Sequence, residues 1–188
     1  MAVASEIEFI APGLCFWRVY DPAVKAELYS TALTIAESTY LVDPVLLTPD
    51  ALAELSSQSA IAGVIVTNEN HQRAAAEFAD KFRVPIHSDG SQAFPSGLTP
   101  VQIEGAVPGE IAVYSEAAGG VVIMGDALIN FEPYGFTFLP AKYCSNVKAM
   151  RRSLPKLLDY SFERMLFAHG TPILTGARRR LEQLLENH

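Results

Sequence analysis

The feature that most constrains the fold of this chain is a continuous apolar run at residues 60–67, followed by a helical pattern and a second strand. Such a run is typical of a strand that is buried on both faces of a sheet. An alanine-rich helical pattern covers 73–82, and 84–87 is again strand-like. Together these segments predict a β-α-β unit, which requires parallel strands and a helix that covers the sheet.

Strand patterns dominate the rest of the chain, and helices interrupt them singly. Before the β-α-β unit we expect strands at 8–20, 28–36 and 38–42 and a short helix that begins after Thr48-Pro49. After it we expect a loop at 88–100, a three-stranded meander at 101–106, 110–115 and 120–125, a helix at 146–160 that Pro155 kinks or divides, a strand at 165–168 and a closing helix at 176–186. This order favours two sheets with helices on their outer faces, in a single domain spanning 1–188.

Composition limits the classes of partner. The chain has 188 residues, of which 49% are hydrophobic and 19% charged, and this balance is typical of a globular protein. Its formal net charge of -7 argues against a nucleic-acid partner, so the arginines at 151–152 and 178–180 are interpreted as solvated helix faces. No apolar run approaches the roughly 20 residues that would cross a membrane.

Cysteine content and the N-terminal residues bear on the compartment. Cys15 and Cys144 are too few for a disulfide framework or a zinc cluster. The first residues have neither a basic segment nor an apolar core of the kind found in secretory signals. We therefore expect a cytoplasmic protein with reduced thiols.

Two strand-like runs end in residues that can bind a metal. Residues 121–126 end in Asp126, and the run at 164–168 is followed by His169. A carboxylate and an imidazole at strand ends suit a hydrolase that uses a divalent metal. Asp126 and His169 are therefore the candidate catalytic residues and the first candidates for metal ligands.

Five landmarks in order resemble the metallo-β-lactamase-fold hydrolases. They are Val42-Asp43-Pro44, the turn at 67–73, the glycine-bounded segment 105–109, Gly125-Asp126 and His169-Gly170. The resemblance runs from Asp43 to the last helix, and it implies an α+β fold with a four-layer αββα sandwich. It further implies a metal site at the strand ends, with Asp43 supporting the site without binding metal directly.

The metal ligands that this resemblance implies are mostly missing. Histidines of the family pattern fall on Asn68, Asn70, Arg73 and Ala106, and an aspartate falls on Gln72. Five of the seven expected ligands are thus absent, and the chain has four histidines where an intact two-metal site uses five. Amides are weak zinc ligands and a guanidinium is always protonated, so we expect no dinuclear site and most simply no cofactor.

The pocket residues expected from these landmarks have a second, purely structural interpretation. They are Asp43, Asn68, Asn70, His71, Arg73, His87 and Glu110. The asparagines would stabilise a turn, and the remaining side chains would be ordinary hydrogen-bonded or surface groups. One specific hypothesis is an ion pair between Arg73 and Asp126 in place of the lost metal.

Three functions remain open from the sequence, and whether the chain is an enzyme is one of the open points. The first is a degenerate metallo-β-lactamase-like protein that keeps a small-molecule pocket or an interaction role. The second is a hydrolase with a relocated or mononuclear site, in which Asp126 and His169 bind one zinc, iron or manganese ion with help from His71, His87 or Glu110. The third is a metal-free hydrolase that uses Asp126 and His169 as general base and orienter. A small-molecule ligand and a homodimer are the expected partners.

Overall fold

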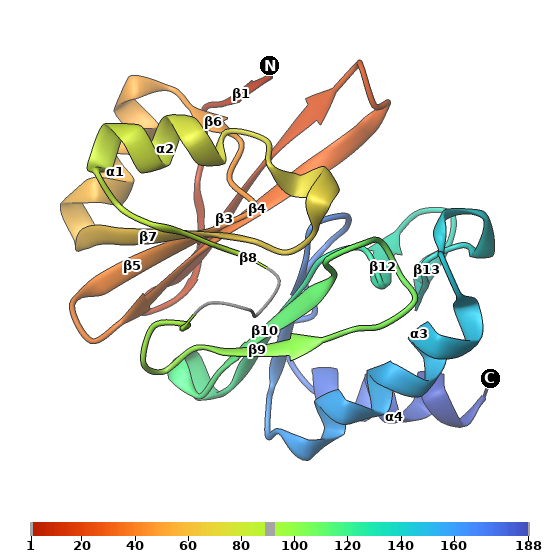
Figure 1. The fold of residues 1–188 in the computed structure, drawn as a ribbon. Helices are drawn as coiled ribbons and strands as arrows, with labels where there is room; N and C mark the ends of the chain where they lie inside the picture. Colours follow the sequence, from red (N-terminus) through yellow and green to blue (C-terminus); the bar gives the residue numbers. More distant parts are fainter. Residues whose placement is uncertain (1, 89–92, 188) are drawn as a thin grey trace.

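Two facing β-sheets form the centre of the molecule, and helices cover both outer faces (Figure 1). The computed structural model describes residues 2–88 and 93–187. The first sheet has the order β2 (Glu8–Ala11), β3 (Leu14–Asp21), β4 (Ala26–Ile35), β5 (Ser38–Val42), β7 (Ala60–Val66), β8 (Ile86–Ser88). The second has the order β14 (Arg164–Phe167), β11 (Val121–Met124), β10 (Ile111–Ser115), β9 (Thr99–Gln102).

The four α-helices within residues 2–88 and 93–187 make the outer layers. Helices α1 (Pro49–Gln58) and α2 (Ala75–Phe82) lie on the first sheet, and α3 (Val147–Ser153) and α4 (Ala177–Glu186) lie on the second (Figure 1). Short 3₁₀ turns are η1 (Glu69–His71), η2 (Ala117–Gly119), η3 (Ala141–Tyr143) and η4 (Leu154–Asp159). Two small pairings complete the fold: parallel β1 (Val3–Ala4) with β6 (Leu46–Leu47), and antiparallel β12 (Leu128–Phe131) with β13 (Gly135–Phe138).

Alternation along the strands produces three apolar layers. In β7, Val64 and Val66 pack with α1 and α2, whereas Ile65 packs against the second sheet. In β11, Val121 and Ile123 face the first sheet, and the intervening Val122 packs with α3 and α4. Because successive side chains point to opposite faces, each central strand contributes to two cores. The structure is therefore the expected αββα sandwich.

Several segments test the sequence-based expectations directly. The β-α-β unit is confirmed, since β7 pairs in parallel with β8 and α2 packs on β7. The expected helix 146–160 is divided as Pro155 predicted, with α3 ending at Ser153 and a 3₁₀ turn following. The single strand at 8–20 was wrong: Gly13, at φ +73°, lets the chain turn back so that β2 and β3 pair as a hairpin.

Other expectations fall partly or wholly outside the described residues. Residues 89–92 of the expected loop 88–100 lie outside the described residues, as does the histidine at position 188. Within the described parts, β8 and β9 shorten that loop from both ends. No helix in 2–88 or 93–187 is long and apolar enough to cross a membrane.

The single tryptophan marks the core beneath α1. Trp17 is fully buried in β3, and its indole Nε1 donates to the carbonyl oxygen of Val45 at 2.9 Å. Its neighbours in the same core include Leu52 and Leu55 of α1. The polar atom of a large buried side chain is thereby satisfied.

Candidate functional site

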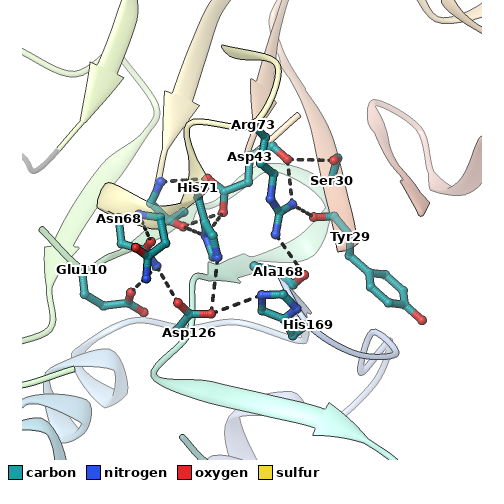
Figure 2. Close-up of polar contacts among 12 residues, drawn as sticks. Tyr29, Ser30, Asp43, Asn68, His71, Arg73, Glu110, Asp126, Ala168 and His169 are labelled. Atoms are coloured by element: carbon teal, nitrogen blue, oxygen red, sulfur yellow. Dashed lines mark hydrogen bonds and ion pairs between the residues drawn. The ribbon is translucent and has the colours of Figure 1, made fainter. Parts of the chain in front are cut away.

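A polar cluster lies where strands of both sheets end (Figure 2). Asp43 follows β5 and His71 lies in the turn after β7, whereas Asp126 follows β11 and His169 follows β14. Within each sheet the two strands concerned are parallel, so their carboxyl ends meet at one edge. Side chains from both halves of the sandwich therefore converge at one seam.

His71 is held at both ring nitrogens by carboxylates. Its Nδ1 lies 2.9 Å from Asp43 Oδ2, and its Nε2 lies 3.3 Å from Asp126 Oδ1. Asp43 itself is buried and accepts from the backbone N–H of Thr67 at 2.8 Å and from the Thr67 hydroxyl. Because a carboxylate only accepts, Nδ1 of His71 carries the hydrogen and Nε2 is directed to the centre of the cluster.

His169 approaches the same carboxylate oxygen from the other sheet. Its Nε2 lies 3.4 Å from Asp126 Oδ1, and its Nδ1 lies 3.3 Å from the backbone carbonyl oxygen of Glu27 in β4. The Glu27 carbonyl is an acceptor, so the hydrogen again belongs on Nδ1. The side chain keeps 22% of its surface exposed, which makes it the most accessible of these three residues.

The charges of the cluster are coupled. Burial opposes ionisation of Asp126, but the hydrogen bond and positive charge of His71 lower its pKa to about 2. Burial likewise opposes protonation of His71, yet the charge of Asp43 and the hydrogen bond to Asp126 raise its pKa to about 9. His169 behaves differently, because burial lowers its pKa to about 4. Without a bound ion, the imidazolium of His71 offsets one carboxylate charge.

Asn68 and Glu110 form the wall behind Asp126. The Asn68 side-chain nitrogen donates to Glu110 Oε2 at 2.8 Å and to Asp126 Oδ2 at 3.1 Å. Glu110 Oε1 accepts from the backbone N–H of Ala127 at 2.8 Å. Glu110 is fully buried, and burial together with the charge of Asp126 raises its pKa to about 8.

The hypothesis of an ion pair between Arg73 and Asp126 is wrong. The Arg73 guanidinium donates instead to the backbone carbonyl oxygens of Tyr29 at 2.6 Å, Asp43 at 2.9 Å and Ala168 at 3.4 Å (Figure 2). Among the described residues, the ionic partners of Asp126 within 4 Å are the two histidines. Three of the five N–H groups are thus directed to backbone carbonyls, which orients the guanidinium toward the backbone rather than toward the carboxylate.

Two other expected pocket residues lie apart from the cluster. Asn70 is exposed, and its backbone N–H donates to the Asn68 side chain. His87 lies in β8 beside Gly63, and its ring packs at a tilt against Phe94 with a ring-centroid distance of 5.6 Å. Asn70 therefore supports the turn through its backbone, and His87 is not part of the group of ligand atoms formed by His71, Asp126 and His169.

The position of His71 was only partly foreseen. The resemblance placed it in a spacer, although it was kept among the pocket residues. In the structure the chain forms a 3₁₀ turn, with His71 N donating to the carbonyl oxygen of Asn68 at 3.1 Å. Residues three apart in such a turn lie on one side, so residues 68 and 71 both face the cluster. A polar pair at that spacing is the signal that would have identified His71.

A cavity of about 310 Å³ lies elsewhere, at the opposite end of β3 and β4 from Glu27. Its walls are largely apolar and include Leu14, Leu55 and Gln58. None of the pocket residues expected from the sequence lines it.

The donor atoms present allow a test of which metal site would fit. Two metal ions do not fit, because Asn68 and Arg73 are committed to the hydrogen bonds described above and Ala106 has no ligand atom. One ion does fit: ligand atoms of His71, Asp126 and His169 all lie within 4.8 Å of one another. Ligands about 2.1 Å from a tetrahedral ion are about 3.4 Å apart, close to the two distances to Asp126 Oδ1.

Comparisons with known proteins agree on the fold. The model of a family described as Metallo-beta-lactamase superfamily matches residues 8–188. The DIM-1 metallo-beta-lactamase structure has a TM-score of 0.71 at 11% identity, over 97% of this chain and 97% of that chain. A metallo-beta-lactamase family protein from Thermus thermophilus has a TM-score of 0.57 at 22% identity, over 96% of this chain and 80% of that chain.

A metallo beta lactamase from Erythrobacter litoralis has a TM-score of 0.67 at 14% identity, over 97% of this chain and 92% of that chain. A search of curated proteins gave no significant match. At identities this low, likeness to the solved structures shows the fold alone.

Proposed function

Because the chain belongs to the metallo-β-lactamase superfamily, we propose that it is a hydrolase with a single metal ion held by His71, Asp126 and His169. One observation carries the proposal. Each imidazole has its Nδ1 bonded to an acceptor of its own, and both Nε2 atoms face the same oxygen of Asp126. This is the arrangement in which second partners orient histidine ligands toward a metal.

The residues of the chain have distinct roles in this function. Asp43 and the Glu27 carbonyl fix the two rings, and Asp126 supplies the anionic ligand. A bound divalent ion would polarise a substrate carbonyl and make a water nucleophilic near neutral pH. The partly exposed His169 marks the side from which a small ester, lactone or thioester would enter.

Metal analysis tests the proposal. Protein expressed with zinc, iron and manganese in the medium should contain about one ion per chain, and the His71→Ala, Asp126→Ala and His169→Ala variants should lose it. His87→Ala is the matched control, because that histidine lies outside the cluster. Esters, lactones and thioesters that the wild type hydrolyses should not be hydrolysed by the Asp126→Ala variant. Metal content that survives in an Asp126→Ala/His169→Ala variant would overturn the assignment of ligands.

A second candidate is a metal-free member that keeps a ligand-binding or interaction role. The observation that favours it is the position of His71 between two carboxylates, where a protonated ring offsets their charge without an ion. In this function the wild type would take up no zinc, iron or manganese even when these are added in excess. Ester hydrolysis by such metal-free protein, lost in Asp126→Asn, would instead indicate general-base catalysis.

A further inference from the structure

We propose that Asn68 and Glu110 are positioning residues that leave Asp126 a single oxygen for the two histidines. The effect on metal binding rests on the proposed function. The positions of the side chains do not depend on a bound ion. Both residues are only 2% exposed, and neither provides an atom to the group formed by His71, Asp126 and His169. They act through Asp126.

The amide of Asn68 has one possible orientation. Its nitrogen donates one hydrogen to each of two carboxylates, Glu110 and Asp126, while its oxygen accepts from the backbone N–H of Asn70 at 2.9 Å. A flipped amide would place its oxygen against the ionised carboxylate of Asp126 and its nitrogen against the backbone N–H of Asn70. Both the nitrogen and the oxygen of the amide therefore have partners that fix its orientation.

Glu110 fixes the far side of this amide. One carboxylate oxygen accepts from Asn68, and the other accepts from the backbone N–H of Ala127, directly after Asp126. Glu110 can approach this closely because residue 125 is a glycine. A Cβ at that position would lie only 2.8 Å from Glu110 Oε1 and from Thr67 Oγ1. Burying a carboxyl group costs free energy, and the two hydrogen bonds that Glu110 accepts offset part of that cost.

The consequence lies in the two oxygens of Asp126. Oδ2 is bound by Asn68, and Oδ1 lies 3.3 Å from His71 Nε2 and 3.4 Å from His169 Nε2. Rotation of the carboxylate would break the hydrogen bond to the amide. Asp126 would therefore bind an ion through Oδ1 alone, leaving a coordination position for substrate or water.

The test uses full-length, chelator-treated protein with ¹⁵N-labelled histidine rings. Asn68→Ser keeps a hydroxyl to cap the turn but is too short to reach the carboxylates, and Glu110→Gln sets one N–H group against another. Both variants should shift the Nε2 resonances of His71 and His169, and the double variant should shift them no further. Asn70→Ser and Glu69→Gln make the same replacements on exposed neighbours and should leave these resonances unchanged.

Unchanged resonances in folded Asn68→Ser and Glu110→Gln would overturn the inference. Glu110→Gln preserves volume, so it carries the test if Asn68→Ser does not fold. A second measurement adds Co²⁺: the variants should bind it about 10–100-fold more weakly than the wild type, with an altered visible spectrum. A wild type that binds no Co²⁺ but shows the expected ¹⁵N shifts would contradict the proposed function and leave the positioning role standing.

Discussion

At the scale of single residues, Arg73 is a cation that binds backbone rather than carboxylate. Its guanidinium joins the carbonyl oxygens of Tyr29 and Asp43 in the first half of the chain to that of Ala168 next to His169. Its own backbone is unusual, with φ at +39°. The planar fork of an arginine suits this task, since it can direct several N–H groups to different acceptors.

Arg73→Lys should lower the free energy of unfolding by roughly 1–3 kcal/mol, because one ammonium cannot reach three carbonyl oxygens and buried acceptors lose their partners. Urea unfolding of chelator-treated protein measures the change. The control is Arg83→Lys, the same replacement at an exposed side chain, which should cost less than about 0.5 kcal/mol. Equal effects of the two substitutions would contradict the role given to Arg73.

The pH dependence of stability follows from His71 and Glu110. Folding raises the pKa of His71 from 6.5 to about 9, so its contribution is complete below pH 6.5 and is lost as pH rises through 9. Folding also raises the pKa of Glu110 from 4.5 to about 8, so the folded state again holds the extra proton and loses stability as pH rises. Metal-free protein should therefore be less stable in urea at pH 9 than at pH 6.5.

The variant His71→Gln provides the comparison for this pH dependence. It removes the histidine contribution, so its stability should decline less steeply between pH 6.5 and 9 than that of the wild type. A wild type whose free energy of unfolding rises over this interval would show that the proton on His71 does not stabilise the fold.

At the scale of elements, local patterns predicted most of what the structure contains. The β-α-β unit and the meander had clear periodicity and turn residues. The hairpin of β12 and β13 was missed, because each strand has only four residues and the turn between them contains Pro133. At the site, Asp126 and His169 were recognisable from their strand ends. The partners of Arg73 were not, because backbone carbonyls from distant segments leave no mark in the sequence.

The β12 strand supports the segment that carries His169. Asn130 N donates to the carbonyl oxygen of His169 at 3.3 Å, and Thr171 N donates to that of Asn130 at 2.8 Å. Gly170, at φ +119°, lies between them, and a Cβ there would be 2.2 Å from the Asn130 carbonyl oxygen. This contact leaves no space for a side chain.

Gly170→Ala should therefore destabilise the protein more than Gly135→Ala, measured by urea unfolding. Gly135 also has positive φ, at +65°, but a Cβ there would meet nothing within 4 Å, so its substitution should cost only the backbone strain of about 1–2 kcal/mol. The ¹⁵N resonances of His169 should move in Gly170→Ala alone. Similar losses in the free energy of unfolding for both variants would mean that β12 shifts to accommodate the added methyl group at residue 170.

At the scale of the whole molecule, the candidate metal ligands come from both halves of the sandwich. His71 follows a strand of the first sheet, and Asp126 and His169 follow strands of the second. An ion held by all three would tie the two sheets together at their shared edge. Metal binding should therefore act on global unfolding and not only on one loop.

Zn²⁺ at 100 times its dissociation constant should raise the free energy of unfolding by about 2.7 kcal/mol. Thermal unfolding with and without the ion measures this effect. His87→Ala should respond as the wild type does, since that side chain packs against Phe94 and is not part of the group formed by His71, Asp126 and His169. His169→Ala should respond little, and an undiminished response there would remove His169 from the set of ligands.

The buried position of Trp17 has a practical consequence for studies of folding. The chain has one tryptophan, and it lies in the core between the first sheet and α1. Indole fluorescence therefore reports on the half of the sandwich that α1 covers. The seven tyrosines are spread over both halves, with Tyr29 in the core between the sheets and Tyr114 in the core beneath α3 and α4, so their signal follows the molecule as a whole. A difference between the two signals would show, without attaching a dye, whether the half beneath α1 unfolds before the rest.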